Sequence, residues 1–168
     1  MTAETIKTGR LEISFTPSDG SADVVMQGQI DERTELVGLA DKVSGTITID
    51  LEKVSFINSV GVREWIRLLR AFKKSDTTLC MRRCSEAMIH QMNMIVEAKG
   101  NAVVESFFAP YVCDACGYEG SMCLDVAPNA EGLKNMEAPA VACPECKESM
   151  EFNEIPERYL LFLEDAAL

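Results

Sequence analysis

The chain has 168 residues, of which 47% are hydrophobic, and a formal net charge of −11 at pH 7. This length allows a buried core in one domain, or in one domain followed by a small module. The charge is uneven, because residues 1–105 hold 13 Lys/Arg against 15 Asp/Glu, whereas residues 106–168 hold 3 against 12. The acidic second part argues against nucleic acid and anionic membrane surfaces as partners.

The sequence also lacks the marks of a membrane or secreted protein. No run reaches the ~18 apolar residues that a spanning helix needs, and the N-terminal segment MTAETIKTGR lacks the apolar core of a signal peptide. We therefore expect a cytoplasmic protein that does not insert into membranes. In that reducing compartment, seven Cys residues favour metal binding or burial over disulfides.

The first two thirds of the chain alternate between strand and helix patterns. Alternating or β-branched apolar residues predict strands at 11–15, 23–30, 46–51, 77–82 and 102–108. Helical spacing of apolar residues predicts helices over 31–43, over 62–72, and from Ser85 to the glycine at 100, the last with Met88, Ile89, Met92, Ile95 and Val96 as its buried stripe. This order predicts an α/β domain with parallel strand pairs.

The stretch from Thr46 to Lys74 organises this domain as strand, turn and helix. Its apolar period changes from 2 to 3.6 at the turn Asn58-Ser59-Val60-Gly61. Ser59 stands where the helix begins. Its hydroxyl is placed either to cap free backbone N–H groups or to present itself to a partner.

Two short motifs lie at strand ends in this region. The first is Gly28-Gln29-Ile30-Asp31, and the second is DLEKVSFINSVGV over residues 50–62. They resemble the Gly-x-hydrophobic-Asp and the Asp-Leu, spacer, Val-x-Phe-Ile-Asp-Ser-Ser-Gly-Leu motifs of the STAS domain, which is found in bacterial anti-sigma factor antagonists and sulphate-transporter tails. The resemblance covers about residues 10–108 and implies a STAS-like mixed sheet with helices.

By position, Ser59 matches the phosphorylated serine of that family. The resemblance implies a non-enzymatic signalling protein in transcription regulation, which binds a serine-kinase anti-sigma factor until phosphorylation at Ser59 dissolves the complex. The partner-binding residues that we expect on this basis and from the charge pattern are Asp31, Asn58, Ser59, Gly61, Arg63, Arg67 and Arg70. Arg63, Arg67 and Arg70 belong with Lys74 to one helix face, which suits an acidic partner or is simply solvated.

Beyond residue 108 the chain changes character. Cys113 and Cys116 form one C-x-x-C knuckle, and Cys143 and Cys146 form a second after 26 intervening residues. Two such knuckles predict a tetrahedral Cys₄ site that holds a metal and folds a zinc-ribbon-like module. The domains we predict are therefore residues 1–108, STAS-like, and residues 109–168, a four-cysteine zinc-ribbon-like module. We expect its C-terminal apolar segment at 155–163 to pack back on the ribbon or on the STAS-like sheet.

Zn²⁺ is the expected ion, because closed Cys₄ sites in a reducing compartment usually hold it. The knuckles also resemble those of rubredoxin, which implies iron and electron transfer as an alternative. Against iron, Lys147 stands where the second rubredoxin knuckle has Gly. A further alternative is a metal- or redox-sensing scaffold in which the ribbon modulates the STAS-like domain.

Little in the sequence supports catalysis. The chain has one histidine, His90, and shows neither a Gly-rich phosphate loop nor a Ser-His-Asp order. We expect Cys80 and Cys84 to be buried rather than to bind metal, and Cys123 to be a spare thiol. The protein is therefore expected not to be an enzyme.

Overall fold

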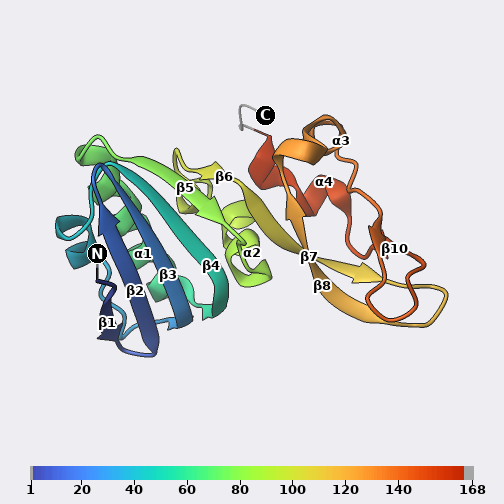
Figure 1. Cartoon of the computed structure of the whole chain (residues 1–168), viewed down its shortest axis with the longest axis horizontal. Coiled ribbons are helices and arrows are strands. Elements are labelled where there is room, and N and C mark those ends of the chain that lie inside the picture. Colours follow the sequence, from blue (N-terminus) through green and yellow to red (C-terminus); the bar gives the residue numbers. More distant parts are fainter. Residues whose placement is uncertain (1, 165–168) are drawn as a thin grey trace.

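The structure is a computed structural model that describes residues 2–164. It has a mixed sheet with helices, formed by the first part of the chain, and a separate antiparallel sheet formed by the second part (Figure 1). The predicted α/β class is thus confirmed. Met1 and the last four residues of the predicted second module, 165–168, lie outside the described part.

The first sheet has six strands in the order β1-β2-β3-β4-β5-β6. They are β1 (Glu4–Thr8), β2 (Leu11–Ser18), β3 (Ser21–Ile30), β4 (Thr46–Ile57), β5 (Thr78–Arg82) and β6 (Val103–Val104). The pairs β1–β2 and β2–β3 are antiparallel, and the pairs from β3 to β6 are parallel. Strand β1 was not predicted, because its sequence ETIKT has a single apolar side chain and leaves the strand largely exposed.

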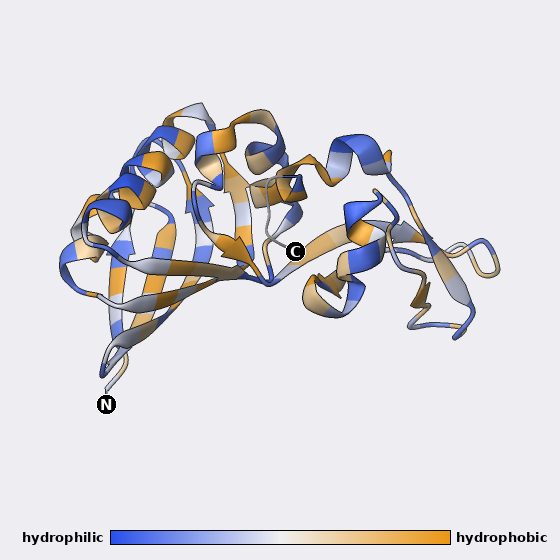
Figure 2. Cartoon of the chain, turned by 90° about the horizontal axis from the view of Figure 1, so that it is seen from above, coloured by the Kyte–Doolittle hydropathy of each residue, from blue (hydrophilic) through white to orange (hydrophobic). Residues whose placement is uncertain are grey.

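Two helices and two 3₁₀ turns accompany this sheet: η1 (Val37–Asp41), α1 (Ser59–Lys74), α2 (Glu86–Met94) and η2 (Val96–Ala98). The apolar stripe of α1 is buried, including Val62, Trp65, Leu69 and Phe72. Figure 2 shows the helices on one side of the sheet. Burial of a side chain such as Phe72 contributes about 1.5–3 kcal/mol, so α1 is held mainly by packing.

The predicted helix over residues 31–43 is wrong, since only the short 3₁₀ helix η1 forms there. Local side-chain hydrogen bonds explain the difference. The Arg33 amide donates to Asp31 Oδ1 at 2.9 Å, and the Asp31 amide donates to Thr34 Oγ1 at 3.0 Å. Such bonds compete with helical ones and favour a turn. Leu36 and Leu39, three residues apart, then suit 3₁₀ spacing and are both buried.

The helix predicted from Ser85 is confirmed at its start but is shorter than expected. Ser85 is the N-cap of α2, and its Oγ accepts from the Met88 amide at 3.4 Å. The helix ends at Met94 because Ile95 adopts an extended conformation. Val96, predicted to be buried, is instead 73% exposed.

The second sheet has the order β8-β7-β10-β9 and is antiparallel throughout. Its strands are β7 (Ser106–Val112), β8 (Glu119–Asp125), β9 (Val141–Ala142) and β10 (Ser149–Phe152), with short helical turns η3 (Ala127–Asn129), α3 (Ala130–Lys134), α4 (Pro156–Tyr159) and η4 (Leu161–Leu163). The extended segment predicted at 102–108 therefore divides between β6 of one sheet and β7 of the other. None of the helices within residues 2–164 is long and apolar enough to cross a membrane.

The apolar segment at 155–163 folds back, as predicted, and packs against α2 and β7. The Asn93 amide of α2 donates to the Tyr159 carbonyl at 2.7 Å, and its Oδ1 accepts from the Phe162 amide at 2.9 Å. The Tyr159 hydroxyl donates to the Phe108 carbonyl at 2.6 Å. The Phe162 ring meets the Phe107 ring edge-on at 5.0 Å. These contacts join the second sheet to the first sheet's helical layer.

Candidate metal centre and the turn before α1

The two knuckles have the same backbone geometry. After β7 ends, the Cys113 amide donates to the Tyr118 carbonyl and the Gly117 amide donates to the Cys113 carbonyl, both at 2.8 Å. Between β9 and β10, the Cys143 amide donates to the Glu148 carbonyl at 2.8 Å and the Lys147 amide to the Cys143 carbonyl at 3.0 Å. Each knuckle thus turns two thiols towards the other knuckle.

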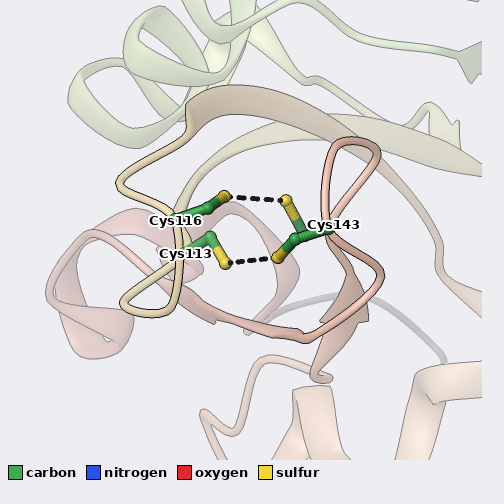
Figure 3. Close-up of side chains that lie close together, drawn as sticks. Cys113, Cys116 and Cys143 are labelled. Carbon is green, nitrogen blue, oxygen red and sulfur yellow. Dashed lines mark hydrogen bonds between the residues drawn. The ribbon is translucent and has the colours of Figure 1, made fainter.

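The four thiols meet at one point, as Figure 3 shows for the labelled cysteines. The Sγ atoms of Cys113, Cys116, Cys143 and Cys146 all lie within 4.8 Å of one another. Cys113 is 3.5 Å from Cys146, and Cys116 is 3.7 Å from Cys143. A tetrahedral Zn–S bond of about 2.3 Å requires S···S edges of about 3.8 Å, whereas a disulfide requires about 2.05 Å. The donor set therefore fits a tetrahedral metal ion.

The electrostatics of the cluster differ from one thiol to another. Burial opposes ionisation of Cys143, but the backbone amides of Cys146 and Glu145 outweigh it and lower the pKa of Cys143 to about 7. At Cys116 the Tyr118 backbone favours the thiolate, yet burial and the other thiols together raise its pKa to about 12. Cys143 is therefore favoured as a thiolate over Cys116, and a bound cation would stabilise that thiolate.

Position 147 carries backbone strain. Gly117 and Lys147 occupy equivalent places in the two knuckles, and both are left-handed, with φ of 77° and 68°. Glycine adopts this region freely, whereas an L-residue with a side chain is disfavoured there by about 1–2 kcal/mol. The Lys147 side chain folds back and donates to the Pro144 carbonyl at 2.9 Å. The geometry of the second knuckle is kept despite this unfavourable residue.

The turn before α1 presents Ser59 without using it as a cap. Asn58 is the N-cap, and its Oδ1 accepts from the Gly61 amide at 2.8 Å. The possibility that Ser59 caps the helix is therefore wrong, because the residue before it satisfies the free N–H group. Ser59 is the first residue of α1, and its side chain is exposed.

Further contacts explain why asparagine stands at position 58 and glycine at position 61. The Asn58 amide nitrogen donates to Glu32 at 2.9 Å, which a carboxylate at position 58 would not do. Hydrogen bonds from the Glu32 backbone and from Asn58 lower the pKa of Glu32. At Gly61, a Cβ atom would lie 2.1 Å from the Ile30 carbonyl oxygen, so only glycine lets α1 approach the end of β3 this closely.

The other predicted partner-binding residues divide between buried and exposed places. Asp31 is 4% exposed and lies 3.9 Å from the Arg10 guanidinium. The side chains of Arg63, Arg67, Arg70 and Lys74 are exposed along α1, and their role in partner binding stays a prediction. Arg67 pairs with Glu64 at 3.3 Å.

An ion pair between buried Asp50 of β4 and two arginines at the end of β5 was not recognised from the sequence. Asp50 is 1% exposed and accepts from Arg82 Nε at 3.2 Å and from Arg83 Nε at 2.7 Å. Arg83 also reaches Glu52 at 2.8 Å, and its amide donates to Ser106 of β7. The available signal was an acid inside a β-branched strand, together with two arginines at the end of the next.

The remaining thiols lie outside the metal cluster. Cys84 is buried as predicted, and burial raises its pKa. Cys80 is only half-buried, and Cys123 is exposed on β8. His90 is exposed, and its ring contacts the Tyr159 ring edge-on at 5.8 Å.

No model of a known protein family matches the chain, and no curated protein matches it. The fold and the four-cysteine cluster therefore define the class that the structure supports: an α/β protein with a mixed sheet, a separate antiparallel sheet and a site built to hold a metal ion.

Proposed function

We propose that this chain is a non-enzymatic signalling protein of the cytoplasm, in which a STAS-like domain of residues 1–108 acts as an anti-sigma factor antagonist-like regulator. Its partner binding is switched by phosphorylation at Ser59. The observation that carries the proposal is the exposed Ser59 side chain at the start of α1, which Asn58 relieves of the capping role. A kinase can modify this hydroxyl without removing a bond that holds the helix.

The effect of the phosphate would be on the surface rather than on the fold. It adds about −1.5 to −2 charges at neutral pH, at the positive end of the α1 dipole, where an anion is stabilised. Glu32, bound to the neighbouring Asn58, brings a second negative charge near the same turn. A partner that docks here would meet a strongly anionic site after phosphorylation, and acidic groups on it would be repelled.

The surroundings of Ser59 suit a protein partner. Phe56 is 47% exposed and Val60 is 38% exposed, so two apolar side chains flank the turn in sequence. The basic face of α1, including Arg63, continues from it. Exposed apolar side chains near a basic face are complementary to a partner with an apolar anchor and an acidic rim, which we propose to be a serine-kinase anti-sigma factor or a related regulator.

For the second module, residues 109–168, we propose a zinc-ribbon-like fold stabilised by Zn²⁺ on the four cysteines. The Sγ separations of 3.5 and 3.7 Å suit a closed tetrahedral site, which zinc usually occupies. Iron is the alternative, as in a rubredoxin-like electron carrier. The two are told apart by colour and metal content, because an iron-loaded Cys₄ protein is red and bleaches on reduction.

The switch is tested with immobilised full-length baits in native cell lysate. Wild type and Ser59→Ala should retain an ATP-binding serine kinase, and Ser59→Asp should lose it. Mass spectrometry should find phosphate on Ser59 of the wild type. Ser44→Asp is the matched control, because Ser44 is exposed and precedes β4. Identical partners on all four baits, with no phosphate on Ser59, would refute the proposal.

A second function, a metal- or redox-sensing scaffold, is favoured by a chain of aromatic contacts. Tyr111, two residues before Cys113, meets Phe152 at 5.7 Å. Phe152 meets Tyr159 at 5.6 Å, and Tyr159 meets His90 of α2 at 5.8 Å. Burial raises the pKa of Tyr111 to about 12, and its hydroxyl donates to the Pro139 carbonyl. Loss of the metal would loosen the first knuckle and, with it, the ring contact between Tyr111 and Phe152, where this series of contacts begins.

The sensor function is tested in the Ser59→Ala variant, where phosphorylation at Ser59 cannot contribute. Partner affinity is measured before and after zinc is removed with a chelator, and again after zinc is restored. A reversible change in affinity is the expected result for a sensor. Unaltered affinity would leave the ribbon a purely structural module.

A further inference from the structure

A groove of about 710 Å³ opens on the first sheet's helical layer, away from both the metal centre and the turn at Ser59. It lies between the second half of α1, the turn that leads into β5, and the segment from η2 to β6. Its volume falls within the range of about 300–1,000 Å³ that is usual for small-molecule sites.

The groove has an apolar lining that the fold leaves uncovered. Ile66 and Leu69 of α1 contribute to one side, and Val96 and Val103 to the other. Val96 is 73% exposed and Val103 is 57% exposed, which makes them two of the most exposed large apolar residues of the chain. Apolar side chains gathered at a concave site are characteristic of ligand binding, whereas single exposed ones are not.

The charge of the groove is opposite to that of the protein. Arg70, Lys73 and Lys99 line it together with Asp76 and Glu97, a balance of three cations against two acids in a chain of net charge −11. Arg70 and Lys73 form no ion pair with any residue between 2 and 164. A small excess of positive charge suits a singly charged anion, because one negative charge is enough to balance it.

Thr77, which also lines the groove, has an unsatisfied hydroxyl. Its Oγ1 is the one buried side-chain polar atom without a hydrogen-bond partner among the described residues. Buried polar groups in native proteins are nearly always paired, so an orphaned hydroxyl beside a groove indicates a missing partner. A carboxylate oxygen can accept a hydrogen bond from this hydroxyl and from the Arg70 guanidinium.

From these four features we propose that the groove binds a small amphiphilic monocarboxylate, with its apolar chain against Val96 and Val103 and its carboxylate at Arg70, Lys73 and Thr77. The Arg70 fork can bind a carboxylate through two parallel hydrogen bonds. The site is separate from the Ser59 turn, although Arg70 belongs to the basic face as well.

Octanoate is the probe, titrated into the zinc-loaded full chain below the concentration at which it aggregates. Binding is followed by the amide and methyl NMR shifts of residues around the groove, with octanol and inorganic phosphate as comparison ligands. We expect saturable shifts at Leu69, Val96 and Val103, and affinity for octanoate about tenfold higher than for octanol, since a bond to a charged group exceeds a neutral one. Phosphate should give no saturable shift.

Two variants locate the carboxylate. Arg70→Gln combined with Lys73→Gln should weaken octanoate binding about tenfold, whereas Lys42→Gln combined with Lys53→Gln makes the same charge change on exposed residues outside the groove and should leave the affinity unaltered. Thr77→Val should weaken binding about fivefold while leaving the urea midpoint equal or higher, because it removes an unsatisfied polar atom.

The proposal is overturned if octanoate gives no saturable shift at the groove. It is equally overturned if octanol binds as tightly, if phosphate competes, or if the Lys42 and Lys53 control loses as much affinity as the Arg70 and Lys73 pair. Loss of binding in Thr77→Val together with a lowered urea midpoint would mean that Thr77 is structural, which contradicts its assigned role.

Discussion

The docking of the C-terminal segment on α2 should depend on one side chain, Asn93. Its amide donates to the Tyr159 carbonyl at 2.7 Å and accepts from the Phe162 amide at 2.9 Å. Asn93→Ala removes both bonds and leaves two backbone groups without their partners. With about 0.5–1.5 kcal/mol for each bond, the free energy that holds the segment should fall by ~1–3 kcal/mol.

Hydrogen exchange of the Phe162 amide is the direct assay. A loss of ~1–3 kcal/mol corresponds to about 5- to 150-fold faster exchange if the segment opens locally. Asn93→Asp keeps the acceptor but loses the donor, so Phe162 should retain part of its protection. Asn129→Ala is the control, because it removes a single exposed bond to the Asp125 carbonyl.

Unchanged exchange at Phe162 in Asn93→Ala would refute this reasoning. Packing alone, chiefly the edge-on contact between Phe107 and Phe162 at 5.0 Å, would then hold the segment. Faster exchange throughout β3 and β4 would also contradict it, because the bonds of Asn93 are predicted to stabilise the junction rather than the first sheet.

Three further substitutions test the turn before α1 and the second knuckle. Gly61→Ala places a Cβ 2.1 Å from the Ile30 carbonyl oxygen and should lower the free energy of unfolding, measured with urea, by about 3 kcal/mol. Asn58→Asp keeps the cap but loses the donor to Glu32, so the Glu32 pKa, measured by NMR, should rise. In the wild type the lowered Glu32 pKa adds stability above its unfolded pKa that is lost as pH falls through the folded value, and in the variant this loss should be smaller and should end at higher pH. Lys147→Gly relieves a φ of 68° and should stabilise the zinc-loaded protein against urea by about 0.5–1 kcal/mol.

Each of these predictions has a contradicting outcome. Wild-type stability in Gly61→Ala would mean that α1 shifts away from β3 at little cost. An unaltered Glu32 pKa in Asn58→Asp would mean that solvent, rather than residue 58, sets it. A destabilised Lys147→Gly would mean that the lysine's bond to the Pro144 carbonyl outweighs the backbone strain.

Sequence patterns predicted those elements of secondary structure that are determined by residues close together in the sequence. The change of apolar period after residue 57 places the start of α1 at Ser59 correctly, because burial of one face selects the conformation. Strand β4, in contrast, continues to Ile57 and is longer than the strand predicted at 46–51. The same reasoning failed at residues 31–43, where bonds made by Asp31 and Thr34 favour a turn. Apolar spacing alone does not report such bonds.

The metal cluster was predictable because the C-x-x-C spacing of the cysteines determines the geometry of each knuckle. Each C-x-x-C turn closes through backbone bonds within six residues, from Cys113 to Tyr118 and from Cys143 to Glu148. Two such turns need only a sheet that brings them face to face. The sequence did not reveal the left-handed conformation of Lys147, since φ at that residue follows from the turn and not from the side chain.

By itself, then, the sequence determined the α/β class, the strand–turn–helix around Ser59 and the four cysteines that meet. Only the tertiary structure decided that Asp50 pairs with two arginines, and that α1 and the η2–β6 segment form a groove. The physical reason is the distance along the sequence over which each kind of interaction acts. Periodicity and capping act within a few residues, whereas these pairings join groups 30 or so positions apart, which come together only after the core has packed.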